Sequence, residues 1–166
     1  DRSEIRHALV IADRGYESYN NMAHVQEKGW KFLIRVKDGK YGICDKLALP
    51  PTGCFDFKVE LSLTRKQTNK AKKLFREPNR YRFIPTNTNF DYLHPRSSCR
   101  DSMKFYTLFF RVVRFKITND SYETVITNLD KETYPPERIK ELYAMRWGIE
   151  TSFRNLKHTV GLAKFH

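Results

Sequence analysis

The chain has 166 residues, of which 40% are hydrophobic and 14% aromatic, so it can bury a core and global disorder is not expected. It carries 31 Lys and Arg against 19 Asp and Glu, and this net charge of +12 favours a polyanionic partner, most simply nucleic acid. The alternative is a basic soluble domain without such a partner. No run of 18 apolar residues occurs, so no membrane-spanning helix is predicted, and three cysteines without a C-x-x-C pair favour a reducing cytoplasm over a disulfide framework.

The first predicted elements form a β-α-β unit. Residues 7–12, HALVIA, are typical of a strand buried on both faces, and this run ends at Asp13, which is followed by turn residues. Residues 17–28 predict a helix that Gly29 can end, and residues 30–37, WKFLIRVK, predict a second strand. Because α/β folds place their chemistry at the carboxyl ends of buried strands, Asp13 is a candidate site residue. The alternative is a turn residue or a helix cap.

The middle of the chain, residues 39–130, is rich in proline and in short β-branched and aromatic stretches, which predict a twisted antiparallel sheet. Residues 65–82 interrupt these strands with eight Lys or Arg and one acidic residue. This basic segment is either a solvated loop or short helix, or, given its interleaved aromatic residues, a contact for phosphate. Its candidate DNA contacts are Lys70, Lys72 and Lys73.

The last predicted element is a helix over residues 136–158. At about 100° per residue, five of its polar side chains fall within an arc of about 80°, beside an apolar stripe: Tyr143, Arg146, Glu150, Arg154 and Lys157. A lone carboxylate among cations indicates either intrahelical ion pairs or a metal ligand beside bound phosphate. Because a hard cation takes oxygen ligands, Asp13 and Glu150 together could hold Mg²⁺.

Two stretches also resemble a known family. YAMRWGIETSFRNLK, residues 143–157, resembles the Y-(2)-R-(3)-E-(6)-K signature of bacterial DDE-class transposases of the insertion-sequence-4 family, with all four letters at the right intervals. IADRGYES resembles the family's second-aspartate block, with Asp13 at the catalytic position. VITNL and LKHTVGL are also similar to that family, whereas residues 40–105 match only as the β-rich insertion that such transposases carry.

The resemblance implies a fold and a set of site residues. The expected fold is α/β: a partial ribonuclease H-like core of residues 1–38 and 131–166 with its first strands missing, a β-rich antiparallel insertion at 39–130 and a long C-terminal catalytic helix. Asp13 and Glu150 would be catalytic and would ligate Mg²⁺ or Mn²⁺. Arg154 lies outside the signature and is a DNA contact by geometry alone. Three signature residues would grip or orient the end DNA near the scissile phosphate: Tyr143, Arg146 and Lys157.

The implied function is that of a bacterial, cytoplasmic and nucleoid-associated transposase. It would cut and join transposon-end DNA by metal-dependent hydrolysis and transesterification, with double-stranded end and target DNA as partners. The family's first catalytic aspartate belongs on an earlier strand, so we expect a fragment that is inactive alone, with an exposed sheet edge that favours self-association. The alternatives are a non-catalytic nucleic-acid-binding module and a nuclease of the same fold.

Overall fold

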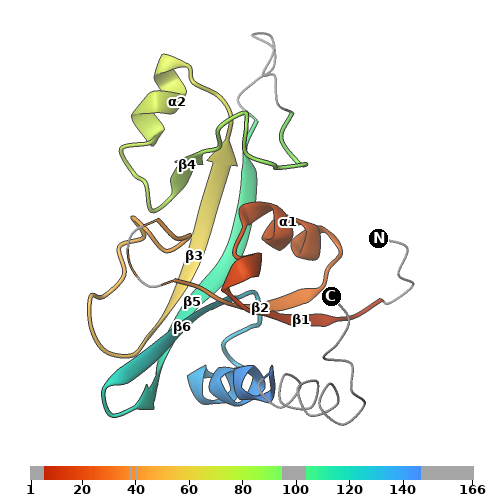
Figure 1. Cartoon of the computed structure of the whole chain (residues 1–166). Helices are drawn as coiled ribbons and strands as arrows, with labels where there is room; N and C mark the ends of the chain where they lie inside the picture. The colour runs from red at the N-terminus through yellow and green to blue at the C-terminus, as the bar shows by residue number, and fades with distance from the viewer. Residues whose placement is uncertain (1–5, 38, 40, 95–103, 147–166) are drawn as a thin grey trace, which may run out of the picture. The chain divides into compact units, whose positions relative to one another are not determined.

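The computed structural model describes residues 6–37, 39, 41–94 and 104–146. Within the chain, Asp1–Leu129 and Asp130–His166 form two compact units. The first unit contains the sheet and two helices (Figure 1). The second contains a helix over residues 136–146.

The first four elements form the predicted β-α-β unit: β1 (Leu9–Ala12), η1 (Arg14–Tyr16), α1 (Tyr19–Glu27) and β2 (Lys31–Arg35). The two strands are parallel, and their register begins with Leu9 opposite Lys31. Helix α1 begins where the Ser18 hydroxyl accepts a hydrogen bond from the Asn21 amide at 3.1 Å, a typical N-cap. Gly29 follows the helix with a φ of 66°, a backbone conformation that glycine adopts without steric cost.

Four further strands and one short helix belong to the same unit: β3 (Phe55–Thr64), α2 (Asn69–Leu74), β4 (Tyr81–Phe83), β5 (Tyr106–Thr118) and β6 (Ser121–Thr127). All six strands join one mixed sheet in the order β1-β2-β6-β5-β3-β4 (Figure 1). β6 pairs antiparallel with β2. A strand from residues 1–38 and a strand from residues 39–130 are therefore neighbours in one sheet. β1 is a terminal strand of the sheet within the described part of the chain.

The direction of β4 differs from the prediction. The middle strands were expected to be antiparallel, and β5 is antiparallel to both β3 and β6, but β4 runs parallel to β3. Parallel neighbours need a crossover connection of a dozen or more residues, usually with a helix. Residues 65–80 provide that connection and contain α2.

One face of the sheet packs against α1 and forms the apolar core. Met22 and Ala23 of α1 are fully buried and belong to the same cluster as alternate residues of the strands. This alternation places successive side chains on opposite faces of a strand. The strand residues of the cluster are Ala12, Phe32, Ile34, Leu61, Leu63, Leu108, Phe110, Val112 and Ile126.

The opposite face carries a buried ion pair between neighbouring strands. Arg111 of β5 donates to both carboxylate oxygens of Asp56 of β3, with Nε–Oδ1 at 3.0 Å and Nη2–Oδ2 at 2.8 Å. Its third nitrogen, Nη1, donates to the carbonyl oxygen of Leu129 at 3.0 Å. The pair therefore links β3 and β5, and Arg111 also binds the backbone just after β6.

The 85–94 loop, which follows β4, is organised around one guanidinium. Arg65 is 7% exposed, and every hydrogen bond that the structure records for its guanidinium goes to a backbone carbonyl of this loop. These carbonyl groups converge on Arg65 from several directions, which suits the planar fork of an arginine better than a single ammonium. They belong to Pro85, Thr88, Phe90 and Leu93.

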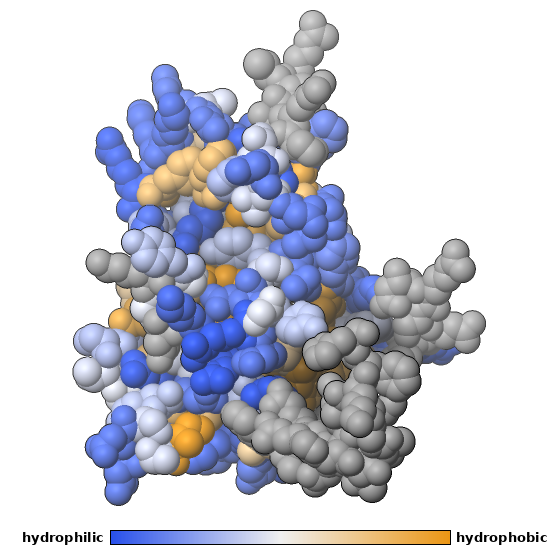
Figure 2. All heavy atoms as spheres, in the orientation of Figure 1, coloured by the Kyte–Doolittle hydropathy of each residue, from blue (hydrophilic) through white to orange (hydrophobic). Residues whose placement is uncertain are grey.

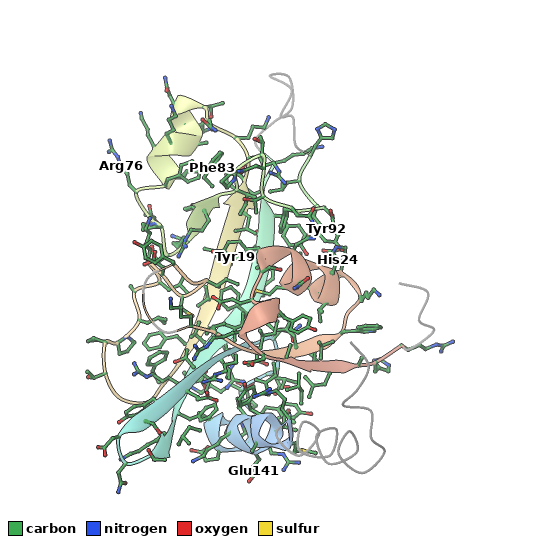
Figure 3. All side chains as sticks on the ribbon, in the orientation of Figure 1. Tyr19, His24, Arg76, Phe83, Tyr92 and Glu141 are labelled. Atoms are coloured by element: carbon green, nitrogen blue, oxygen red, sulfur yellow. The ribbon has the colours of Figure 1, made fainter. Side chains whose placement is uncertain are left out.

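The same loop is also held to α1. One carboxylate oxygen of Asp91 accepts from the Asn20 amide at 3.0 Å and lies 2.6 Å from Nε2 of His24. These two hydrogen bonds, that of Asn20 first, lower the pKa of Asp91. The Tyr92 hydroxyl lies 2.9 Å from Nδ1 of His24, and Figure 3 shows the two side chains next to one another.

The second unit begins with a turn and a helix. The Thr133 amide donates to Oδ1 of Asp130 at 2.7 Å, and the helix over residues 136–146 follows. On its surface Arg138 donates to Glu141 at 2.7 Å. The helix was predicted to reach residue 158, but residues 147–158 lie outside the described residues. In the described part of the chain, no helix is long and apolar enough to cross a membrane.

Candidate active site and nucleic-acid interface

Asp13 lies at the carboxyl end of β1, where it was predicted. Its backbone is extended, with φ −88° and ψ 175°, and its carbonyl oxygen accepts a hydrogen bond from the Tyr16 amide at 3.0 Å. Its side chain makes no capping hydrogen bond to the 3-10 turn. Asp13 is therefore not a side-chain cap, which was one of the alternatives. The side chain is 47% exposed although its Oδ1 atom is buried, so a ligand from solvent can approach only the exposed part of the carboxyl group.

Arg35, which the sequence did not single out, lies beside Asp13, and Glu123 pairs with Arg35 in turn. Nη1 of Arg35, from β2, is 3.8 Å from Oδ1 of Asp13, and Nη2 forms an ion pair with Oε1 of Glu123, from β6. Strand register brings them together, because β2 lies between β1 and β6. The guanidinium thus lies within ion-pair distance of the Asp13 carboxylate and is itself held by Glu123. In the sequence, Arg35 could have been noticed because it is a charged residue within the predicted strand WKFLIRVK.

The segment after β2 is tied to the segment after β1 by Glu17. Its two carboxylate oxygens accept backbone hydrogen bonds from Lys37 at 3.1 Å and from Ile43 at 2.6 Å. Glu17 follows the 3-10 turn that begins directly after Asp13. The two loops at this edge of the sheet are therefore held together by one side chain.

The residues present fit a divalent metal ion in part. A hard cation takes carboxylate oxygens, and Asp13 offers one solvent-accessible carboxylate. No group of three or more His, Cys, Asp or Glu among the residues that the structure describes is arranged to hold a metal ion. The second predicted ligand, Glu150, lies outside the described residues, as do Arg154 and Lys157.

Tyr143 and Arg146 share one face of the helix in the second unit, as their spacing predicted. The Arg146 guanidinium lies 5.2 Å from the centre of the Tyr143 ring, within the range of a cation–π contact. Both are buried, with exposed fractions of 2% for Tyr143 and 8% for Arg146.

The basic segment at 65–82 contains two kinds of cation. Arg65 and Lys66 are buried, and Arg82 donates to the Pro78 carbonyl at 2.6 Å and to the Asp45 carbonyl, so these three belong to the framework. The others surround α2, where Figure 2 shows hydrophilic side chains projecting from the surface. Four of them are exposed and have no ion pair with any residue in the described ranges: Lys70, Lys72, Lys73 and Arg76.

These features define a mixed α/β domain with a half-exposed carboxylate at the edge of its sheet and a separate basic helix. A family model described as the transposase DDE domain matches residues 1–166. The chain therefore belongs to the family of DDE transposase domains, whose general function is transposition-related nuclease activity on DNA. Domains of this family generally use divalent metal ions. No curated protein matches the chain.

Proposed function

We propose that this chain belongs to the insertion-sequence-4 group of DDE transposases and contributes two acidic residues to a ribonuclease H-like site that cuts and joins transposon-end DNA. The observation that supports this most is Asp13, which is half-exposed at the carboxyl end of a parallel strand and is contacted there by Arg35. The YxxRxxxExxxxxxK spacing of residues 143–157 is the second support.

Each proposed residue has a separate task. Asp13 and Glu150 would hold Mg²⁺ or Mn²⁺, which when bound activates the attacking hydroxyl and stabilises the leaving oxygen. Arg35 would keep the carboxylate of Asp13 oriented from β2. Lys157 would position the end DNA, with Arg154 as a further phosphate contact. Tyr143 and Arg146 are buried, so they would support this face of the helix from within and would not touch the DNA directly.

Replacing Glu150 by Gln is expected to weaken Mn²⁺ binding at least about 100-fold, since even residues that only support metal ligands contribute 10- to 100-fold. DNA affinity should persist, because the substitution removes no cation. Isothermal titration with Mn²⁺ and fluorescence anisotropy with duplex DNA measure the two quantities.

Glu141→Gln provides the control for this experiment, because Glu141 is an exposed carboxylate on the helix of the same unit and pairs with Arg138. It should leave Mn²⁺ binding unchanged. Equal Mn²⁺ affinity of the Glu150→Gln variant and the wild type would favour the alternative, a nucleic-acid-binding module without chemistry.

The basic helix α2 is proposed to contact phosphates of the same DNA. Replacing Lys70, Lys72 and Lys73 together by Gln should then reduce the slope of log affinity against log salt concentration by up to about 2.7, since each phosphate contact contributes about 0.9. The measurement is DNA binding by anisotropy between low and physiological salt.

A triple variant that removes the same charge elsewhere is the control for α2. Arg6, Lys31 and Lys104 are also exposed, and replacing them by Gln changes the net charge equally. If both triple variants lower the slope to the same extent, α2 is not a specific contact and only the overall charge matters.

A further inference from the structure

Tyr41 has an environment that folding alone does not require. Its side chain is 92% exposed and makes no hydrogen bond or ring contact with any residue that the structure describes. Its φ is 74°, a region in which bulky L-residues are rare and strained. An aromatic ring that is both solvent-exposed and on a strained backbone adds nothing to the core and is available to a ligand.

The segment that carries Tyr41 is anchored at both ends. Glu17 accepts the backbone hydrogen bonds of Lys37 and Ile43, on either side of Tyr41. A Cβ at Gly42 would come within 2.9 Å of Oε1 of Glu17, which shows how closely the segment packs on that carboxylate. Ile43 itself is 6% exposed and joins the core. One carboxylate therefore holds the described residues on either side of Tyr41.

The anchored loop lies at the edge of the sheet that carries Asp13. β1 and β2 are parallel neighbours, so Asp13 and the loop after β2 follow the same ends of adjacent strands. Arg14 and Lys37 are exposed there and have no ion pair with another residue in the described ranges. An aromatic ring among uncompensated cations is the arrangement by which proteins bind single-stranded nucleic acid, with the ring on a base and the cations on phosphates.

We propose that Tyr41 stacks on an unpaired base of the DNA whose phosphodiester lies at Asp13. The inference rests on the proposed function, since it requires DNA at that edge of the sheet. Arg14 and Lys37 neutralise the phosphates that flank the stacked base. Glu17 is a positioning residue, because it holds the loop and does not itself touch the DNA.

The test uses the full chain and two short duplexes of the same arbitrary sequence, one blunt and one with three unpaired nucleotides at one end. Stacking on an aromatic ring tolerates any base, so no terminal-repeat sequence is needed. The wild type should prefer the duplex with unpaired nucleotides, called the frayed duplex below. Tyr41→Asn should weaken binding to it by about 5- to 150-fold, the equivalent of one stacked base. Binding to the blunt duplex should change little.

The variants separate stacking from folding. Asparagine tolerates positive φ, so Tyr41→Asn should unfold at the same temperature as the wild type or above it, and Tyr41→Trp should retain the preference for the frayed duplex. With 2-aminopurine among the unpaired nucleotides, the wild type should quench its fluorescence and the Asn variant should not. Phe109→Asn, which removes an exposed ring from β5, is the control and should leave the preference intact.

The possible failures are distinguishable. If the wild type binds DNA with a salt dependence that falls when the α2 lysines are replaced, but Tyr41→Asn retains the preference for the frayed duplex and the quenching, this inference is wrong and the proposed function stands. If the wild type binds neither duplex, both are wrong.

Discussion

Replacing Asp56 by Ala is expected to lower the free energy of unfolding by about 3 to 5 kcal/mol, because it removes the carboxylate partner of a buried charge. The side chains of Arg111 and Asp56 are 4% and 6% exposed, and the arginine binds both carboxylate oxygens. Water cannot readily take the place of the carboxylate at such a depth. Urea denaturation of the variant and the wild type measures the difference.

Two comparisons make this expectation specific to the buried pair. Glu141→Ala breaks the Arg138–Glu141 pair, whose side chains are 58% and 63% exposed, and should cost less than about 1 kcal/mol. Asp56→Leu combined with Arg111→Met removes both buried charges and should recover much of the loss, since apolar residues often replace such a pair without penalty. Equal losses from Asp56→Ala and Glu141→Ala would contradict the expectation.

Replacing Arg65 by Met is expected to lower the free energy of unfolding by about 2 to 6 kcal/mol. The substitution leaves the buried carbonyl groups of Phe90 and Leu93 without their donor, and each such acceptor costs about 1 to 3 kcal/mol. The carbonyl groups of Pro85 and Thr88 are only partly buried, beside a pocket of about 430 Å³ that water can enter, and they add less.

Hydrogen exchange would locate the effect of Arg65→Met, because the amides of the 85–94 loop should exchange faster while those of β5 should not. Arg76→Met removes an exposed cation of the same basic segment, which points away from the sheet (Figure 3), and should change stability by less than about 0.5 kcal/mol. Arg65→Lys should be intermediate, since it retains the charge without the fork of donors. A variant Arg65→Met as stable as Arg76→Met would show that the loop does not depend on the guanidinium.

The sequence allowed the β-α-β unit to be predicted because its signals are local. The apolar run before Asp13 and the helix that Gly29 ends depend on neighbours in the chain, and the structure contains both elements. The direction of β4 was wrong because parallel or antiparallel pairing depends on how the chain crosses between strands, and strand composition does not encode it. The pairing of β6 with β2 likewise joins residues almost a hundred positions apart.

Charge was the least predictable property of the site. A count of the basic segment treats its cations alike, yet Arg65 and Arg82 donate to backbone carbonyl groups while the lysines of α2 are exposed. Whether an arginine meets carbonyl oxygens or solvent depends on loops distant in sequence. For the same reason Arg35 was not selected, since its contacts with Asp13 and Glu123 come from strand register.

A continuous strand also fixes a length. From Tyr106, beside the end of β3 that leads into α2, to Val113, level with the edge that carries Asp13, β5 advances about 23 Å, and three interstrand spacings to β1 add about 14 Å sideways. The diagonal is about 27 Å, the rise of about eight base pairs of duplex. Hydrogen-bonded strands connect the two points, so a double helix that reaches both Asp13 and the end of β3 that leads into α2 has to span about eight base pairs.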